Sequence, residues 1–426
     1  MAEILNLESS KLPKSASFEF NLEALRGFAA FTVVLSHYLG FSSIMQNGYK
    51  ATGIFKYAFP GHFCVLLFFI LSGYVIGLST KSKLTWSTTL PYAKKRIIRL
   101  YPIYIICIVL GLFVSNDTYS LKTVLSNIFF LQGITSKVIF EVNTIWSLNF
   151  EILFYILFIP ISIYSIKPSF AIIFFLIVGL FFQFIIPITL VNTYSYGFCF
   201  WLIGLYLATT KSTTKKYQSI YSLVGLIFLM LSFESLNYLY ELSHFKFLLD
   251  KPLDNYINER PGVTLSDLTN VPVIVVLILF FSNKNLKLKP LLVGYTFITP
   301  LLFILFQIYK STKLTLDLDS YIFAYTFYIL GIIFMIIGKG EKSVSINLLP
   351  KYIINIGSIS YALYLIHFPV MIFFGKINIF GNDTVSYIIK FFTSILVSIV
   401  IAYLLEKKLQ PYIASIFRPN RKTISN

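Results

Sequence analysis

The sequence predicts an all-α fold, a polytopic membrane helix bundle of about 10–12 transmembrane helices with both termini in the cytoplasm. Composition is the first reason, because 57% of the 426 residues are apolar and only 12% are charged, whereas soluble domains carry roughly 25% charged residues. The apolar residues also form many runs of about 20, which is the length that crosses the hydrocarbon core of a bilayer. The third reason is the distribution of Lys and Arg between those runs.

Twelve apolar segments are candidate spans. In chain order they cover residues 20–40, 59–80, 97–115, 145–165, 169–190, 195–210, 217–233, 271–283, 290–308, 320–338, 354–375 and 385–405. The residues before the first span mix Glu and Lys and lack a small-residue cleavage site, so the first span is expected to stay in the protein. With no internal repeat or linker to divide the chain, we expect one membrane domain at 20–406. A cytoplasmic segment at 1–19 precedes it, and a basic cytoplasmic tail at 407–426 follows.

The orientation follows from the basic residues in alternate loops. With the N-terminus inside, the inner segments carry 23 Lys and Arg and the outer segments carry 10, as the positive-inside rule requires. The formal net charge of +17 is then a property of the cytoplasmic face. A soluble nucleic-acid-binding protein reaches such a charge by lining a groove, without apolar runs of this length, so no nucleic-acid partner is expected.

Three of the few ionisable residues at bilayer depth are expected at a similar height. A charged group there is costly, which makes it a functional candidate. At 1.5 Å per residue, His37 lies about 25 Å and His367 about 20 Å above the inner face, while Glu151 lies about 9 Å below the outer face. An imidazole beside a carboxylate is suited to general-base catalysis, because the carboxylate fixes its tautomer. One shared site is the functional interpretation, and a buried, hydrogen-bonded histidine is the structural one.

Four basic residues stand together where the third span begins: Lys94, Lys95, Arg96 and Arg99. Such side chains are suited to gripping the phosphates of a cytosolic donor, although ordinary positive-inside charge explains the same cluster. The three cysteines lie singly in apolar runs without a metal-ligand spacing, so we expect packing roles for them and no metal site.

Five stretches form a recognisable series along the chain. The first, Leu25–His37, reads LRGFAAFTVVLSH and places Arg26 eleven positions before His37. The others are Phe68–Ile76 (FFILSGYVI), Arg96–Pro102 (RIIRLYP), Thr144–Tyr155 (TIWSLNFEILFY) and Ser360–Pro369 (SYALYLIHFP). In this order they resemble the acyltransferase-3 family of integral membrane O-acyltransferases. The resemblance covers about residues 20–406, and the chain is similar to stand-alone polysaccharide and lipopolysaccharide O-acetylases, without an appended hydrolase-like domain.

The resemblance implies transfer of an acetyl (acyl) group from cytosolic acetyl-CoA to a sugar hydroxyl of a cell-surface glycan or its lipid-linked precursor, in the bacterial inner membrane. The lipid bilayer, acetyl-CoA and the glycan acceptor are the implied partners. His37 matches the family's essential histidine, Arg26 its paired arginine, and Glu151 the acid of a tryptophan-containing motif. Arg96 and Arg99, with Lys95 beside them, match a basic motif that contacts the donor. Further residues of the matching stretches are expected to line the site, namely Ser72, Trp146, Tyr361 and His367.

Our hypothesis for the reaction joins these parts. The donor nucleotide binds at the basic motif and its pantetheine arm runs past Arg26 to His37, because the eleven positions between these two residues span about 16 Å. His37 is then the general base and Glu151 orients its imidazole, with an acetyl-histidine intermediate as the mechanistic alternative. Two other classes remain open. One is a proton-coupled secondary transporter with the buried charges as its relay, and the other is a glycan polymerase or flippase-like membrane protein.

Overall fold

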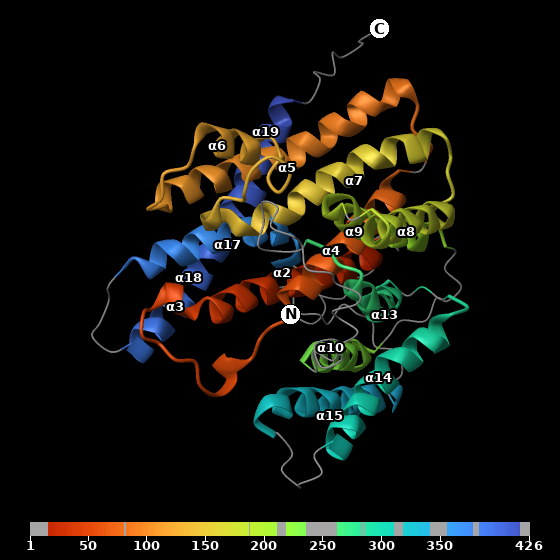
Figure 1. Ribbon diagram of the computed structural model, residues 1–426, viewed down its shortest axis with the longest axis vertical. Helices are drawn as coiled ribbons and strands as arrows, with labels where there is room; N and C mark the ends of the chain where they lie inside the picture. The colour runs from red at the N-terminus through yellow and green to blue at the C-terminus, as the bar shows by residue number, and fades with distance from the viewer. Residues whose placement is uncertain are drawn as a thin grey trace, which may run out of the picture.

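A computed structural model describes residues 16–80, 82–186, 188–210, 219–235, 262–282, 284, 286–310, 318–340, 356–377 and 383–417. Throughout these residues the secondary structure is helical, and no strand is present beyond an isolated bridge between Gln132 and Ser136. The helices pack side by side into a bundle, and most of them are viewed obliquely in Figure 1. The all-α fold class predicted from the sequence is therefore confirmed.

Each of the twelve expected spans overlaps a helix. In chain order these helices are α2 (Ala16–Gly40), α4 (Gly61–Ser79), α5 (Trp86–Val114), α7 (Trp146–Ile163), α8 (Pro168–Phe184), α9 (Thr189–Thr209), α10 (Ile220–Ser235), α13 (Val271–Phe281), α14 (Lys289–Lys310), α15 (Leu318–Gly340), α17 (Ser360–Gly375) and α18 (Asp383–Leu404). Shorter elements lie between or after them, namely α3 (Ser42–Met45), η1 (Gly53–Lys56), α6 (Leu121–Ile128), η2 (Phe140–Ile145), η3 (Ser266–Asn270), the π-helical turn η5 (Leu405–Leu409) and α19 (Gln410–Ile416).

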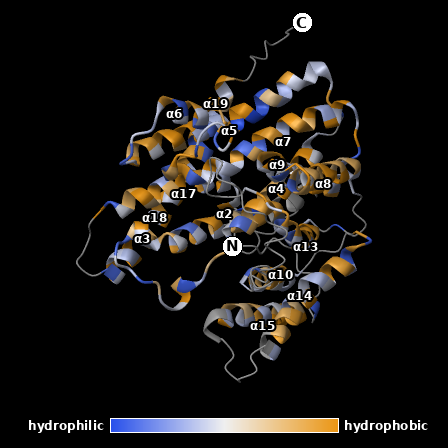
Figure 2. Ribbon diagram, in the orientation of Figure 1, coloured by the Kyte–Doolittle hydropathy of each residue, from blue (hydrophilic) through white to orange (hydrophobic). Residues whose placement is uncertain are grey.

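Within the described residues, six stretches are long and apolar enough to cross a membrane. They are Gly61–Ser79, Trp86–Val114, Phe140–Ile163, Lys289–Phe306, Tyr321–Lys339 and Asp383–Ile416. Shorter apolar helices accompany them, and two of these, α13 and α17, are buried along nearly their whole length. Apolar residues dominate most of the helices in Figure 2. The chain is a multi-pass membrane protein in which some short helices are enclosed by others.

The helix that carries the basic cluster begins earlier than the apolar pattern predicts. Thr85 caps α5, because its side chain and that of Thr88 bond each other's backbone amides in a capping box. α5 therefore starts at Trp86 rather than near residue 97. The first turns of α5 are polar, so a search for apolar runs does not include them. As a result, Lys94, Lys95, Arg96 and Arg99 lie on one continuous helix.

The helices α4 and α9 touch along their backbones. A Cβ added to Gly73 would lie 1.9 Å from the carbonyl oxygen of Trp201, and one added to Gly204 would lie 1.9 Å from that of Ile70. Real Cβ atoms cannot approach so closely, so both positions require glycine for the contact. Gly73 thus allows α4 to pack closely on α9, while Ser72 beside it hydrogen-bonds Glu151 on α7. α8 covers another side of α9, and the three helices lie together in Figure 1.

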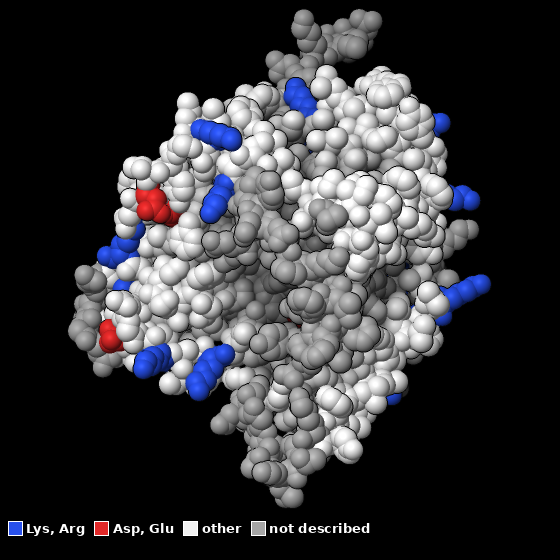
Figure 3. Space-filling model, viewed as in Figure 1, with Lys and Arg blue, Asp and Glu red and all other residues white. Residues whose placement is uncertain are grey.

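The rest of the bundle divides into two groups. In the first group, α2 and α7 contact α4, and α17 packs against α2, α5 and α18. In the second group, α10 packs along α15, and α13 packs against α14 in the lower half of Figure 1. Figure 3 shows that on this face most charged side chains lie toward the edge, and that the described surface between them is largely uncharged. The candidate site residues all lie in the first group.

Candidate active site

Two histidines from opposite ends of the sequence meet in the bundle. The Nδ1 atom of His37 on α2 lies 2.8 Å from the Nε2 atom of His367 on α17, and the two rings are stacked within 10° of parallel. His367 is fully buried, and His37 is partly buried. His37 and His367, which were expected at similar heights in the bilayer, are thus in direct contact.

The contacts of His367 determine where its proton lies. Its Nδ1 atom is 3.0 Å from the carbonyl oxygen of Leu363, which can only accept a hydrogen bond. In the neutral ring Nδ1 therefore carries the proton, and Nε2 accepts from the Nδ1–H of His37. This arrangement leaves the lone pair of His37 on its Nε2 atom. The hydrogen-bonded chain of two imidazoles and one carbonyl thus fixes the tautomer of His37.

Close backbone contacts on both sides hold the two histidine helices together. A Cβ added to Gly357 would lie 1.9 Å from the carbonyl oxygen of Glu23, and one added to Gly375 would lie 2.3 Å from that of Ile44. The contacts of residues 23, 37 and 44 with residues 357, 367 and 375 follow the same order in both segments. The segments therefore run parallel, as expected for the first and eleventh spans of an alternating bundle.

A cavity of about 190 Å³ lies between five helices near this pair. Residues from α2, α4, α5, α7 and α17 line it, namely Arg26, Val65, Phe68, Phe69, Leu71, Ser72, Val75, Ile76, Ser79, Lys95, Arg96, Arg99, Leu100, Ser147, Leu148, Glu151, Tyr155, Ser360, Tyr361 and Tyr364. The lining residues of α4 run from Val65 to Ser79, fourteen positions that correspond to about 21 Å of helix. The cavity is therefore elongated along α4.

One end of the cavity is basic, and we refer to Lys95, Arg96 and Arg99 as the basic end. The guanidinium of Arg96 stacks on the rings of Tyr92 and Tyr155, with 5.1 and 5.9 Å to the ring centroids. Its Nη2 atom is 3.5 Å from Ser79 Oγ, and its Nε atom is buried without a hydrogen-bond partner in the described structure. An unpaired, buried donor of this kind is suited to an anion.

Lys94 does not belong to the basic end, although it adjoins Lys95 in the sequence. Its ammonium lies 5.9 Å from the ring of Phe417, and it does not line the cavity. The helical arrangement thus separates one member of the expected cluster from the other three. This residue provides a matched control for the basic end, because it has the same charge on the same helix.

At the other end, Tyr364 separates the cavity from the histidine pair. Its ring centroid is 6.3 Å from that of His367, and its hydroxyl bonds Ser147 Oγ at 2.8 Å and donates to the carbonyl of Thr144 at 2.9 Å. Tyr364 and Ser147 line the cavity, but the two histidines do not. We refer to His37 and His367, with Tyr364 beside them, as the histidine end.

Glu151 lies on the wall between the two ends and contacts neither histidine. Its carboxylate accepts from Ser72 Oγ at 2.9 Å and from the hydroxyl of Tyr155, and the indole of Trp201 donates to Ser72 at 3.3 Å. The structure therefore places His367, and not Glu151, on the ring of His37. Among the described residues, the acid instead ties α7 to α4 and places its carboxyl group on the cavity wall.

Arg26 lines the cavity from α2. Its Nη1 atom lies 3.4 Å from the carboxylate of Glu23, and its side chain is 20% exposed. Glu406 in the π-helical turn interacts electrostatically with both Arg26 and Arg99, and it accepts a hydrogen bond from the backbone of Ala362 at 3.3 Å. The sequence interpretation missed Glu406, although an acid directly after an apolar segment was a signal for it.

The remaining expected residues divide between the cavity and its surroundings. Tyr361 lines the cavity and donates to the carbonyl of Leu100 at 2.8 Å. Trp146 does not line it and instead stacks on His62, 6.0 Å between ring centroids. Tyr155 and Tyr364 were missed as site residues, even though they lie four positions after Glu151 and three before His367. Such spacings place side chains on the same helix face.

Comparison with known protein families agrees with the resemblance of the five stretches. A family model described as an acyltransferase domain matches residues 19–407. The chain belongs to the acyltransferase-3 family. A search of curated proteins and a search of solved structures each found no match. As a member of the acyltransferase-3 family, the protein is a membrane acyltransferase, and this membership favours acyl transfer over secondary transport or glycan polymerisation and flipping.

Proposed function

We propose that the protein is a membrane O-acetyltransferase. It moves an acetyl group from cytosolic acetyl-CoA to a sugar hydroxyl of a cell-surface glycan or its lipid-linked precursor. The observation that carries this proposal is the cavity that extends from three cations to Tyr364, which lies beside a pair of histidines with a defined tautomer. An anionic donor and a proton-accepting group are the two things that acetyl transfer from a coenzyme A thioester to a hydroxyl requires.

The donor binds at the basic end. Coenzyme A carries a pyrophosphate and a further phosphate, and Lys95, Arg96 and Arg99 supply permanent positive charge and several donors to these groups. The buried Nε of Arg96 gains a partner when a phosphate arrives. Because this end carries the basic loops expected inside, it faces the cytoplasm of a bacterial inner membrane, with both termini on the same side.

The pantetheine arm occupies the length of the cavity. The lining of α4 extends about 21 Å from Ser79 to Val65, and the rise from Arg26 to His37 along α2 is about 16 Å. A long, flexible, mostly apolar arm fits a narrow cavity of this kind. Arg26 and Glu151 are the charged groups along the way, and Arg26 stabilises negative charge on the donor.

Acetyl transfer takes place at the histidine end. Nε2 of His37 takes the proton of the acceptor hydroxyl while its oxygen attacks the thioester carbonyl. A carbon–oxygen bond forms, the carbon–sulfur bond breaks, and the coenzyme A thiolate leaves with the proton that the imidazolium returns. His367 stabilises the imidazolium, because its Nε2 atom continues to accept from the Nδ1–H of His37.

The direct test is to follow the acetyl group in sealed, inside-out inner-membrane vesicles. Vesicles that contain the protein are supplied with radiolabelled acetyl-CoA, and the surface glycan is then recovered and analysed by mass spectrometry. We expect base-labile acetyl groups on the glycan only when the protein is present. Glycan of the same mass with and without the protein would refute the proposal. Radiolabel on a lipid or a protein, and none on the glycan, would show that the acceptor is not a glycan.

A further inference from the structure

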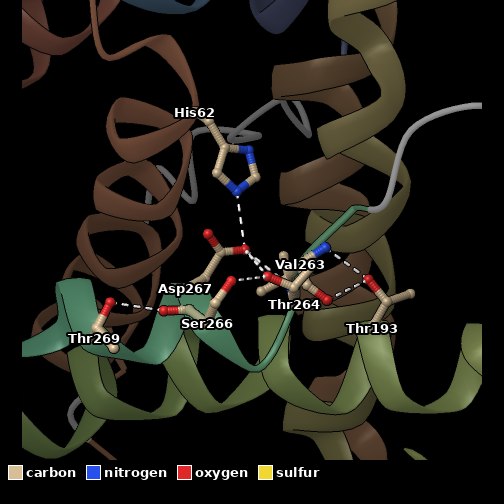
Figure 4. A network of polar contacts seen from close by, with 7 residues as sticks. All are labelled: His62, Thr193, Val263, Thr264, Ser266, Asp267 and Thr269. Atoms are coloured by element: carbon tan, nitrogen blue, oxygen red, sulfur yellow. Dashed lines mark hydrogen bonds and ion pairs between the residues drawn. The ribbon is translucent and has the colours of Figure 1, made fainter. Parts of the chain in front are cut away.

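A second histidine site lies beside the histidine end, built on η3 and on the first turn of α4. Figure 4 shows His62 above a turn formed by residues 263–269. Its Nε2 atom lies 3.0 Å from the carboxylate of Asp267. The His62 side chain is 43% exposed, while that of Asp267 is only 12% exposed. An exposed imidazole thus rests on a mostly buried carboxylate.

Asp267 is held in place by its own turn. Its carboxylate accepts from the backbone amide of Thr264 at 2.8 Å and from the Thr264 hydroxyl at 3.2 Å. Burial by itself would raise the pKa of Asp267, but His62 and the Thr264 donors outweigh burial and lower it. The carboxylate therefore stays charged and fixes the orientation of His62.

The turn does not need His62 as an anchor. Thr193 on α9 accepts from the backbone amide of Val263 at 2.6 Å and donates to its carbonyl at 2.7 Å (Figure 4). Gly262 also packs directly against the ring of Phe150. These contacts attach the turn to α9 and α7 without the imidazole. A purely structural role for His62 therefore does not explain why its imidazole is exposed and yet held in one orientation by Asp267.

Trp146 supports the face of the His62 ring. The two rings lie within 15° of parallel, with 6.0 Å between centroids, and the indole packs edgewise on Phe69 and Phe150. The hydrogen bond to Asp267 and the stacking on Trp146 thus both orient the imidazole. A polar group set on an aromatic wall is typical of sites that orient small polar ligands.

The site lies at the level of His37. A Cβ added to Gly61 would lie 2.2 Å from Ser36 Oγ, so the residues next to His62 and His37 are in contact. Val65, one turn further along α4, lines the cavity, as does Ser147 next to Trp146. From His62 to Ser79 at the basic end, α4 rises about 26 Å. His62 therefore stands at the end of the cavity opposite to the donor phosphates.

We propose that His62, positioned by Asp267 and Trp146, binds a hydroxyl of the acceptor sugar and presents the neighbouring hydroxyl to His37. This inference rests on the proposed function and adds an acceptor subsite to it. The subsite selects acceptors with a second hydroxyl beside the one that reacts, because the imidazole exchanges a hydrogen bond with that hydroxyl while Asp267 holds its ring. His62 acts in binding, and His37 remains the group that moves the proton.

The test separates acceptor binding from catalysis. The full chain in nanodiscs, which leave both faces open, receives saturating radiolabelled acetyl-CoA, and the surface glycan of the producing cells, de-esterified with mild base, is titrated as the acceptor. In His62→Gln, the new amide still donates to Asp267, so bracing is preserved while the imidazole is lost. We expect the KM for the glycan to rise about tenfold, the value of one hydrogen bond, with kcat and the Kd for coenzyme A within twofold of wild type. Trp146→Phe and Asp267→Asn should each raise the same KM by threefold or more.

The matched control is Asp383→Asn, which changes an acid at the start of α18 that accepts a hydrogen bond from Gln46 at 2.9 Å. Its KM should remain within twofold of wild type. A KM for His62→Gln that rises less than threefold, a loss of kcat at unchanged KM, or failure of this variant to accumulate in the membrane would each overturn the inference. Absence of acetylation by the wild-type protein would instead contradict the proposed function itself.

Discussion

The two ends of the cavity carry different kinds of charge. At the basic end, the ammonium group of Lys95 and the guanidinium groups of Arg96 and Arg99 lie on the single helix α5. At the histidine end, two imidazoles from α2 and α17, 330 positions apart, form a hydrogen-bonded chain that gains or loses a proton. Fixed cations hold an anion in place, whereas coupled imidazoles move a proton. Under the proposed function, the basic end therefore binds the donor and the histidine end carries out the chemistry.

The largest effect is expected at His37. In His37→Ala, the rate of acetyl transfer should fall by about 10³-fold or more, because the base and its fixed tautomer are both lost. The Kd for coenzyme A should not change, because the basic end is intact. Initial rates in membrane vesicles and calorimetric titration of the purified protein measure the two quantities. A transfer rate within tenfold of wild type would contradict the assignment of proton transfer to the histidine end.

A smaller effect is expected at His367, which positions His37 without reaching the substrate. His367→Leu removes the acceptor for the Nδ1–H of His37 and should lower kcat by about 10²-fold with an altered pH–rate profile. His367→Gln retains an oxygen that can accept this hydrogen bond, so it should recover part of the loss. Equal rates for the Leu and Gln variants would mean that His367 only fills space.

At the basic end, the expected loss is in affinity. Arg96→Ala and Arg99→Ala should each weaken coenzyme A binding by about 10–100-fold, in line with the loss of charge-assisted hydrogen bonds, and leave kcat at saturating donor nearly unchanged. Lys94→Ala is the matched control and should bind coenzyme A as the wild type does, because its ammonium lies on Phe417. Equal weakening in all three variants would indicate a diffuse electrostatic effect and no defined site.

The smallest effect concerns the stability that the His62–Asp267 pair contributes. The lowered pKa of Asp267 means that its charged form is favoured in the folded protein. Its contribution is therefore present above the unfolded value of about 3.9 and is lost as the pH falls through the folded value. Asp267→Asn should cost about 1 kcal/mol or less at pH 7, since the pair is partly exposed, and less than that at pH 3. A Tm difference that persists unchanged at pH 3, measured in detergent solution, would contradict this assignment.

The sequence predicted individual helices and heights better than it predicted neighbours. Runs of apolar residues located twelve helices, and helix rise brought His37 and His367 to one level. Glu151 was expected at the same level, but its partners are Ser72 and Tyr155. An apolar helix exposes similar surfaces on all sides, so hydropathy does not specify which helix packs on which.

Close backbone approach decides the neighbours instead. Gly73 and Gly204 join α4 to α9, and Gly357 and Gly375 join α17 to the α2 and α3 segments. Each glycine is matched to a particular carbonyl far away in the chain, and a single sequence does not reveal this pairing. The separation of Lys94 from the basic end has a local cause, because the extended start of α5 fixes which face of the helix each lysine occupies.

The proposed function requires the donor arm to run from the basic end through the cavity and past Tyr364 toward His37. It is tested most directly by cryo-electron microscopy of the full chain in nanodiscs with ethyl-CoA, a thioether analogue of acetyl-CoA that cannot transfer its alkyl group. The account predicts phosphate density against Lys95, Arg96 and Arg99, and an arm that follows α4 so that its ethyl carbon lies about 3.5 Å from Nε2 of His37. Phosphates bound away from α5, or an arm that ends outside the bundle with its sulfur far from the histidine pair, would contradict it.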